Sequence, residues 1–367
     1  MKRKILCCML LLVMALTGCV DQTNVEDVSF VLVIGVDLDD DDRLVVSLSS
    51  PVFSKEAKLK QERNIVKSVT IRDSREKFDD TVMALTSGSK TQVILIGRKL
   101  LAQKNWTKYL EPFFRDPKNT VTSRVVAVKG SVSDLVFYNP KDKPQLSLYL
   151  MKLIDTSSRR NEVVRTNVQD FYRQTSEKGM TASITAMKKT NKIWLTGSAL
   201  LDEKGRYKMT ISSHESKLLR ILQDKTQGEF SFTIGMKPQS EDGKKEWLSF
   251  GAQNIKVKTK VRYDGHFIFD INAKMGVSLT ERLFAFNVRK NSKKLEKSIE
   301  AKLKADFERL IKKIQDAEID PIGLGLYARA YTYPQWKKVQ NHWGKALSKA
   351  DVNVKVNVKI AGMGTIK

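Results

Sequence analysis

The sequence predicts a multi-domain α+β protein: an N-terminal mixed sheet with helical cover, then a C-terminal antiparallel sheet crossed by a long amphipathic helix. Three patterns support this fold class. Continuously apolar runs at 29–36, 92–97 and 125–128 are typical of strands buried on both faces. An apolar stripe with helical period extends over 291–316. Apolar and polar residues alternate strictly over 352–360, as in a strand with one dry face and one wet face.

Helical patterns separate the apolar runs of the first half. Phe78, Val82 and Leu85 share one helical face before the second run. A second helical set follows that run and comprises Leu101, Trp106, Tyr109, Leu110 and Phe113. Helices that alternate with buried strands indicate a sheet covered by helices.

The acidic run 39–42 raises the question of a calcium site. It lacks the glycine and the distal glutamate of an EF-hand loop. A solvated hairpin turn between two strands is therefore the favoured interpretation.

A helix is predicted over 145–154, where Pro144 suits the first turn. Its apolar face comprises Leu146, Tyr149, Leu150, Leu153 and Ile154. Polar and basic residues follow over 156–165 without periodicity, which predicts an exposed, poorly ordered connection. A short helix around 168–172 comes next.

From Ile193 onward the chain is rich in predicted strands with turn signals at short intervals. Strands at 194–202 and 206–211 flank Glu203-Lys204-Gly205, and strands at 255–263 and 266–276 flank Asp264-Gly265. Both patterns predict hairpins. A helix over 213–224 and a strand over 229–235 complete this part.

The long helix over 291–316 presents one apolar stripe, formed by Leu295, Ile299, Leu303, Phe307, Leu310, Ile311 and Ile314. Because only one stripe is apolar, we expect the helix to lie across a sheet. The alternating segment 352–360 is expected to be an antiparallel strand of that sheet.

The predicted division of the chain is a signal peptide (1–18), an N-terminal α/β domain (19–190) and a C-terminal α+β domain (191–367), with a second candidate boundary near residue 225. The signal peptide has a basic head, an apolar stretch over 5–16 and small residues before the cut. Twelve apolar positions are too few to cross a bilayer, which needs about 20 residues.

The segment Leu16-Thr17-Gly18-Cys19 reads as a lipobox. A plain secretion signal does not require a cysteine directly after the cut, so Cys19 is the predicted site of lipid attachment. Cys7 and Cys8 lie in the removed segment. The mature chain would therefore carry one acylated cysteine and no disulfide, cysteine-based metal site or thiol nucleophile.

The chain carries a formal net charge of +24. Such a surface attracts anionic partners, which could be nucleic acid, an anionic bilayer, a polyanionic wall polymer or acidic loops of another protein. Solvated faces of strands and helices are the favoured interpretation for most of these basic residues. Export argues against nucleic acid, and no nucleic-acid-binding motif is present.

The usual catalytic patterns are missing. His214, His266 and His342 sit in unrelated contexts, and no HExxH, GxSxG or CxxC motif occurs. We therefore expect no enzyme activity, no cofactor and no metal site. Gly323 and Gly325 form a GxG that follows a helix rather than a buried strand, which favours turn glycines over a nucleotide site.

Aromatic residues cluster after this turn: Tyr327, Tyr331, Tyr333, Trp336 and Trp343. A helix over 334–347 would pack the tryptophans, together with Val339 and Leu347, into a core. The alternative interpretation is a ligand or partner surface, and packing is favoured.

Taken together, these segments resemble the Ger(x)C family, the C-subunit lipoproteins of nutrient germinant receptors in endospore-forming bacteria. The similarity covers nearly the whole chain and is clearest in four segments: Cys19-Val20-Asp21 with Glu26; Ile34-Gly35-Val36-Asp37; 93–136 with Arg115-Asp116-Pro117 at its centre; and 320–343 followed by 351–360. Val20 stands where the family commonly has tryptophan. Ala328-Arg329-Ala330 lies where relatives vary, so no binding role is carried over to it.

The resemblance implies a non-enzymatic lipoprotein subunit on the outer surface of the spore inner membrane, partnered by two membrane-embedded subunits, A and B. The implied complex senses small nutrients and starts spore germination. The alternative function is a solute-binding lipoprotein of an ABC transporter, which would have two similar α/β lobes. A wall-active hydrolase is disfavoured because no paired catalytic acids are found.

Overall fold

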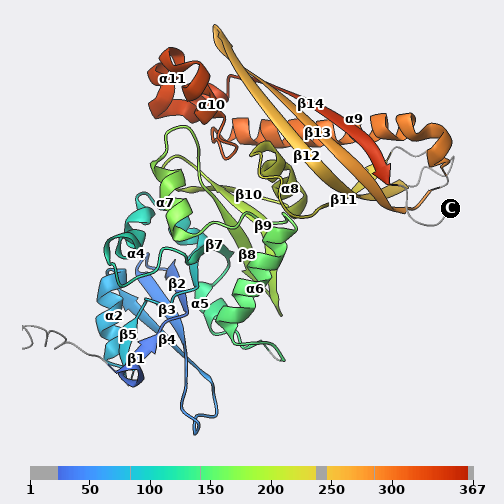
Figure 1. Ribbon diagram of the computed structural model, residues 1–367. Coiled ribbons are helices and arrows are strands. Elements are labelled where there is room, and N and C mark those ends of the chain that lie inside the picture. The colour runs from blue at the N-terminus through green and yellow to red at the C-terminus, as the bar shows by residue number, and fades with distance from the viewer. Residues whose placement is uncertain (1–23, 83, 141, 237–245, 285, 363–367) are drawn as a thin grey trace, which may run out of the picture.

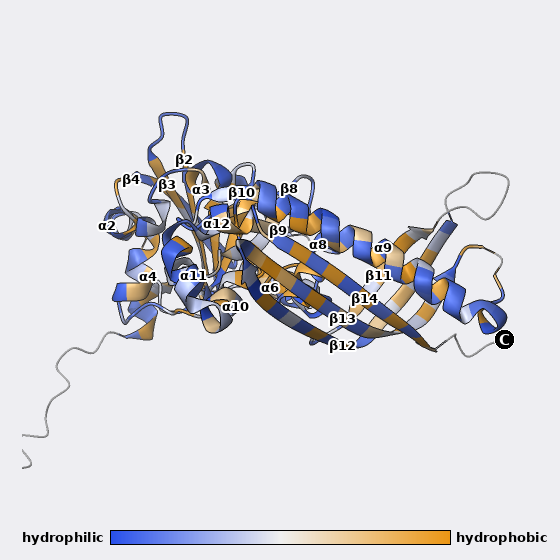
Figure 2. Cartoon of the chain, turned by 90° about the horizontal axis from the view of Figure 1, so that it is seen from above, coloured by the Kyte–Doolittle hydropathy of each residue, from blue (hydrophilic) through white to orange (hydrophobic). Residues whose placement is uncertain are grey.

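The computed structural model describes residues 24–82, 84–140, 142–236, 246–284 and 286–362. Within these residues the chain forms an eight-stranded sheet, a four-stranded sheet and a two-stranded sheet. Figures 1 and 2 show the four-stranded sheet and its long helix extending away from the eight-stranded sheet, which makes the molecule elongated. The α+β class with two unlike sheets is confirmed.

The first half of the chain builds the eight-stranded sheet and its helices. Its elements are η1 (Val25–Asp27), β1 (Val28–Phe30), β2 (Val33–Leu38), β3 (Leu44–Pro51), β4 (Gln61–Ser68), α2 (Ile71–Asp79), β5 (Leu85–Ser87), β6 (Val93–Gly97), α3 (Arg98–Leu101), η2 (Trp106–Leu110), α4 (Glu111–Arg115), β7 (Arg124–Lys129), α5 (Val132–Val136), α6 (Leu146–Arg159), α7 (Val168–Ser176), β8 (Ser183–Lys189), β9 (Ile193–Leu201) and β10 (Tyr207–Ile211).

The strand order of this sheet is β10-β9-β8-β7-β6-β2-β3-β4. Strands β2, β6, β7 and β8 run parallel to one another, and the outer strands pair antiparallel. Helices α2, α3, α4 and α7 pack on one face, and α5 and α6 pack on the other. The predicted mixed sheet with helical cover is therefore confirmed, and it continues past residue 190 to Ile211.

The first apolar run forms two strands rather than one. The Val31 amide donates to Ser87 O, and the Leu32 amide donates to Ser49 O. These two neighbouring amides therefore form hydrogen bonds to two different sheets. Strand β1 pairs with β5 in the two-stranded sheet, and β2 pairs with β6 in the eight-stranded sheet. Periodicity alone cannot reveal such a break.

Two further predictions for this half were wrong. Helix α2 ends at Asp79, and Leu85 lies in strand β5 with 53% of its surface exposed, so it shares no helical face with Phe78. The segment 156–165 is ordered: α6 continues to Arg159 and Val163 is fully buried.

Asn161 explains the order of that segment. It adopts a left-handed backbone conformation, with φ of 56°. Its side-chain amide donates to Gln227 O at 3.1 Å and to Glu229 O at 3.0 Å. These contacts join residues almost 70 positions apart in the chain, which a local pattern cannot encode.

The second half builds the four-stranded sheet. Its elements are α8 (Ser213–Leu222), β11 (Phe230–Met236), β12 (Glu246–Asp264), β13 (His266–Arg282), α9 (Val288–Asp316), α10 (Leu324–Tyr331), α11 (Tyr333–Val339), η3 (Gln340–His342), α12 (Trp343–Leu347) and β14 (Asp351–Gly362). Both predicted hairpins, at 203–205 and at Asp264-Gly265, are confirmed. The predicted helix over 334–347 is broken into α11, η3 and α12.

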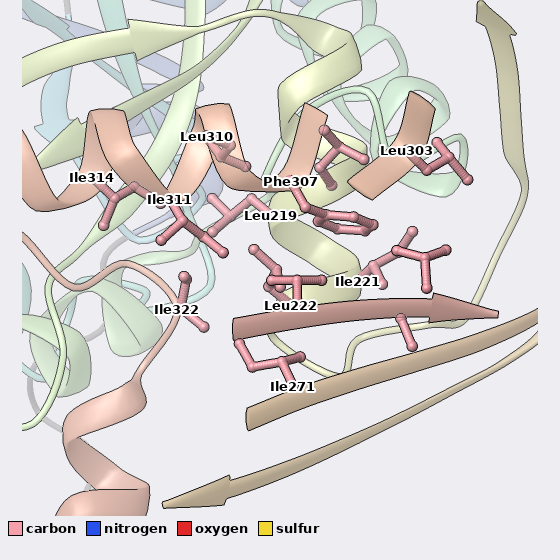
Figure 3. Close-up of a cluster of buried hydrophobic side chains, with 14 of the residues drawn as sticks. Leu219, Ile221, Leu222, Ile271, Leu303, Phe307, Leu310, Ile311, Ile314 and Ile322 are labelled. Atoms are coloured by element: carbon pink, nitrogen blue, oxygen red, sulfur yellow. The ribbon is translucent and has the colours of Figure 1, made fainter. Parts of the chain in front are cut away.

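Helix α9 crosses the four-stranded sheet as predicted. Its apolar stripe packs on the sheet and on α8 in one continuous core. Figure 3 shows Phe307 of α9 next to α8, with Ile271 of β13 in the same cluster. Leu200 and Ile211 of the first sheet belong to the same core, so α8 joins the two sheets.

The predicted direction of the last strand was wrong, because β14 pairs parallel to β13. Helix α9 explains this direction. Beyond the kink at Asn291, residues 292–316 rise about 38 Å along the helix axis, which returns the chain to the end of the sheet where β13 began. Alternation predicts which side of a strand is buried but not which way the strand runs.

Candidate docking face

The residues predicted from sequence as the lipid-attachment site, Leu16, Thr17, Gly18 and Cys19, lie outside the described residues. The described chain begins at Asn24. The site that the structure offers instead is a surface of the four-stranded sheet.

One face of this sheet is packed under α9 and α8, and on the other face the lysines of the described residues are exposed. On β12 the residues Val257 and Val261 turn toward the core, and Lys258 and Lys260 turn outward. Strands β13 and β14 continue the same alternation. We define the basic sheet face as the outward-facing Lys256, Lys258, Lys260, Arg262, Asp270, Asn272, Lys274, Asn353, Lys355, Asn357 and Lys359.

The basic sheet face carries seven cations and one carboxylate. Its carboxylate, Asp270, is engaged by Arg262 and by Asn353 Nδ2, which lies 2.9 Å from Asp270 Oδ1. Among the described residues, no carboxylate forms an ion pair with the six lysines of the face. Like charges at this density attract an anionic partner and disfavour a cationic one.

The outer edge of the sheet is closed to strand addition along part of its length. Glu300 Oε1 accepts from the Val358 amide at 2.8 Å, and Glu296 Oε1 accepts from the Ile360 amide at 2.8 Å. These two carboxylates stand one turn apart on α9 and satisfy amides of the edge strand β14. The basic sheet face is therefore more accessible than this part of the edge.

A cleft of about 800 Å³ opens at the carboxyl ends of β2 and β6. Asp37 ends the Gly-x-Asp segment there, and the amide of Leu38 donates to Asp37 Oδ1 at 2.9 Å. Burial raises the pKa of the Asp37 carboxyl above its ordinary value, while hydrogen bonds from backbone amides and the charge of Lys99 oppose the rise.

The sequence pattern did not reveal that two glycines of this cleft, Gly97 and Gly35, leave no room for a side chain. A Cβ atom at Gly97 would lie 1.9 Å from Asp37 Oδ1, and one at Gly35 would lie 2.5 Å from Val132 Cγ1. Glycine at these positions lets β2, β6 and α5 approach closely. The residues that carry the family resemblance here thus act in packing.

The acidic run 39–42 forms a turn between β2 and β3, which confirms the hairpin interpretation. Lys67 Nζ lies 2.8 Å from Asp39 Oδ2, and Lys99 Nζ lies 3.3 Å from Asp42 Oδ1. The hydrogen bond from Lys67 is the main cause that holds the pKa of Asp39 well below its usual range. The two lysines that line the cleft, Lys67 and Lys99, are therefore engaged by the acidic turn.

Gly323 lies in a turn, as predicted, with a left-handed backbone directly before α10, whereas Gly325 lies in the first turn of α10. Their amides donate to the fully buried carboxylate of Asp320, each at 2.8 Å, and Trp343 Nε1 donates to Asp320 Oδ2 at 2.7 Å. Burial raises the pKa of Asp320, while these donors favour its charged form. Trp336 and Trp343 are buried, so the core interpretation is confirmed for the tryptophans; Tyr331 and Tyr333 are exposed.

Two of the three histidines lie within hydrogen-bond distance of an aspartate. His214 Nε2 lies 3.2 Å from Asp306 Oδ2, and His266 Nε2 lies 2.9 Å from Asp351 Oδ2. Lys302 also contacts Asp306, at 3.0 Å. Burial raises the pKa of Asp306, but hydrogen bonds from His214 and Lys302 outweigh it and leave the pKa below its ordinary value. No cluster of three or more potential metal ligands occurs among the described residues.

Comparison with known families accounts for both halves of the chain. The model described as "Spore germination protein N-terminal domain" matches residues 21–189. The model described as "Spore germination B3/ GerAC like, C-terminal" matches residues 196–364. The chain belongs to the GerAC/B3 family of spore germination proteins. The resemblance to germinant-receptor C subunits is thereby confirmed, and the family is not known for enzymes.

Relatives align with this GerAC-family chain from end to end. Spore germination protein B3 of Bacillus subtilis (strain 168) is 26% identical, over 98% of this chain and 97% of its own. Spore germination protein GerQC of Bacillus cereus is 23% identical, over 99% of both.

The fold also matches a solved structure. The crystal structure of the GerBC protein superposes with a TM-score of 0.58 at 20% identity, over 89% of this chain and 96% of that one. Within the described ranges, no helix of this GerAC-family protein combines the length and apolar character needed to cross a bilayer.

Proposed function

We propose that this GerAC-family chain is the lipid-anchored, non-enzymatic subunit of a nutrient germinant receptor and acts in initiating spore germination. It is held at the outer surface of the spore inner membrane by an acylated Cys19, next to membrane-embedded A and B subunits. The observation that carries the proposal is the order of features: a lipobox ends at residue 19, and the first family domain begins at residue 21.

Acylation would hold the chain at the membrane although no helix of the described residues is long and apolar enough to cross it. Two acyl chains give stable attachment, where a single chain gives marginal binding. Tethering also raises the effective concentration of the subunit near its partners, so weak contacts suffice for assembly.

Replacement of the acylated sulfur tests the anchor. Cys19→Ala should move the protein from the membrane fraction to the soluble fraction and impair nutrient germination. Cys8→Ala, in the segment that is cut away, is the matched control and should change neither. Full membrane retention and normal germination of Cys19→Ala would contradict the proposal.

Docking is assigned to the basic sheet face, where charge complementarity favours acidic segments of a partner subunit outside the bilayer. Lys258→Glu with Lys260→Glu should reduce recovery of the partner subunits in a pull-down from solubilised membranes. Lys293→Glu with Lys297→Glu, two exposed positions on α9, makes the same change of charge on another surface. Equal recovery with both pairs would argue against this face.

The solute-binding alternative is not supported by the architecture. It calls for two similar α/β lobes, whereas this chain joins an eight-stranded mixed sheet to a four-stranded sheet under one long helix. Calorimetric titration with nutrients separates the two functions, since a solute-binding protein gives saturable heat and the proposed subunit alone should give none.

A further inference from the structure

The loop between β3 and β4 exposes large apolar side chains. Phe53 has 78% of its surface exposed and Leu59 has 68%. The loop spans 52–60 and projects from the lower end of the molecule in Figure 1, beyond β3 and β4. Single exposed apolar residues are common on protein surfaces, but two on one projecting loop form a contact feature.

Hydrogen bonds hold the base of this loop. The Val52 amide donates to Lys60 O at 3.1 Å. The Lys60 ammonium donates to Ser54 O at 3.0 Å. The loop is therefore closed at its base and presents both apolar side chains outward.

The charge of the loop is positive. Lys55, Lys58 and Lys60 lie within it and Glu56 is its one acid, so three cations and one anion give +2. Among the described residues, none of these lysines forms an ion pair with a carboxylate. Apolar tips next to unpaired lysines are typical of segments that rest in the interface of an anionic membrane.

The sheet register places this loop at the edge where the chain enters the fold. Pro51 pairs with Gln61 at the base of the loop, and Ser49 of β3 pairs with Val33, the first residue of β2. Strand β1 and η1, which follow the first described residue, Asn24, precede β2 directly. Figure 1 shows β1 at the same lower end of the molecule as the loop.

We propose that the loop 52–60 is a second membrane contact, in which Phe53 and Leu59 enter the boundary between headgroups and acyl chains and the lysines face anionic lipid phosphates. The inference rests on the proposed lipid anchor. Four residues lie between Cys19 and Asn24, and the five Cα–Cα steps from one to the other span at most about 18 Å. An acylated Cys19 would thus hold this edge of the eight-stranded sheet close to the bilayer.

The mature chain makes a clean labelling experiment practical, because its cysteine is acylated and an introduced cysteine is the one free thiol. Phe53→Cys carries an environment-sensitive fluorophore, and the acylated protein is reconstituted into vesicles of phosphatidylcholine with phosphatidylglycerol. Nitroxide-labelled lipid in the bilayer is the quencher. The matched control is the same label at Tyr331→Cys, which is 73% exposed on α10.

We expect quenching at position 53 to exceed quenching at position 331 several-fold. The excess should fall in vesicles of phosphatidylcholine alone and with Lys55→Gln and Lys58→Gln combined, which leave the hydrogen bond from Lys60 to Ser54 O in place. Protein that stays on the vesicles with equal quenching at both positions would overturn the loop contact and leave the anchor intact.

Two other results would also overturn the loop contact. A label shielded from aqueous iodide but not quenched by nitroxide lipid would mean that the loop meets protein, such as a second copy of the chain. Protein that does not remain on the vesicles would refute the anchor and, with it, the contact that depends on it.

Discussion

Phe307 offers the sharpest test of how the C-terminal part is held together. Its ring is fully buried on α9, between α8 and the four-stranded sheet (Figure 3). Phe307→Ala removes the ring and leaves a cavity in a core that can collapse only partly, because the long helix is fixed along its length. The expected loss of unfolding free energy is about 3–5 kcal/mol. This is a large share of the 5–15 kcal/mol typical of a domain.

Urea denaturation measures this loss, with tryptophan fluorescence as the probe, since Trp336 and Trp343 belong to the same core. Lys304→Ala is the control on the same helix: its ammonium is exposed and lies 3.6 Å from Glu308 Oε1. That variant should change stability by less than about 0.5 kcal/mol. A loss below about 1 kcal/mol for Phe307→Ala, or one equal to the control, would refute the packing argument.

Three further predictions address the contacts described above. Gly97→Ala should displace the Asp37 carboxylate and lower the free energy of unfolding by roughly 1–3 kcal/mol, measured by thermal or urea denaturation. Unchanged stability would contradict the close approach of Gly97 to Asp37. Glu300→Ala should expose the Val358 amide and speed its hydrogen exchange, whereas Glu300→Gln, which keeps an acceptor, should do so less. The pKa of Asp306 in the folded protein lies below the ordinary 3.8. The Asp306 carboxylate therefore stabilises the folded state fully at pH values above 3.8, and this stabilisation is lost as the pH falls through the lowered pKa. Asp306→Asn should therefore be less stable than wild type at neutral pH, with a gap that closes on acidification; a gap independent of pH would argue against this ion cluster.

Local patterns predicted the parts of the fold whose burial repeats along the chain. The apolar stripe of α9, the alternation of β14 and the turn at Asp264-Gly265 each have a period or a turn residue that sequence displays directly. The same is true of β6, whose continuous apolar run is buried on both faces.

Features that depend on distant contacts were not predictable in this way. The direction of β14 is set by the length of α9, and the order of 156–165 is set by hydrogen bonds from Asn161 to Gln227 and Glu229. The break between β1 and β2 arises because adjacent amides bond to different sheets.

The candidate surfaces divide along the same line. The alternating lysines of β12 and β14 predict a basic, solvent-exposed face from the sequence alone. Which strands share that face follows only from the register. The exposed Phe53 and Leu59 lie in a loop with no periodicity, so their position at the edge where the chain enters the fold emerges only from the structure.

The most direct test of lipid anchoring is mass spectrometry of the mature protein isolated from spore membranes. With the proposed anchor, the N-terminal peptide should begin at Cys19 and carry a thioether-linked diacylglycerol. A chain that retains residues 1–18, or a mature terminus with an unmodified Cys19, would contradict it.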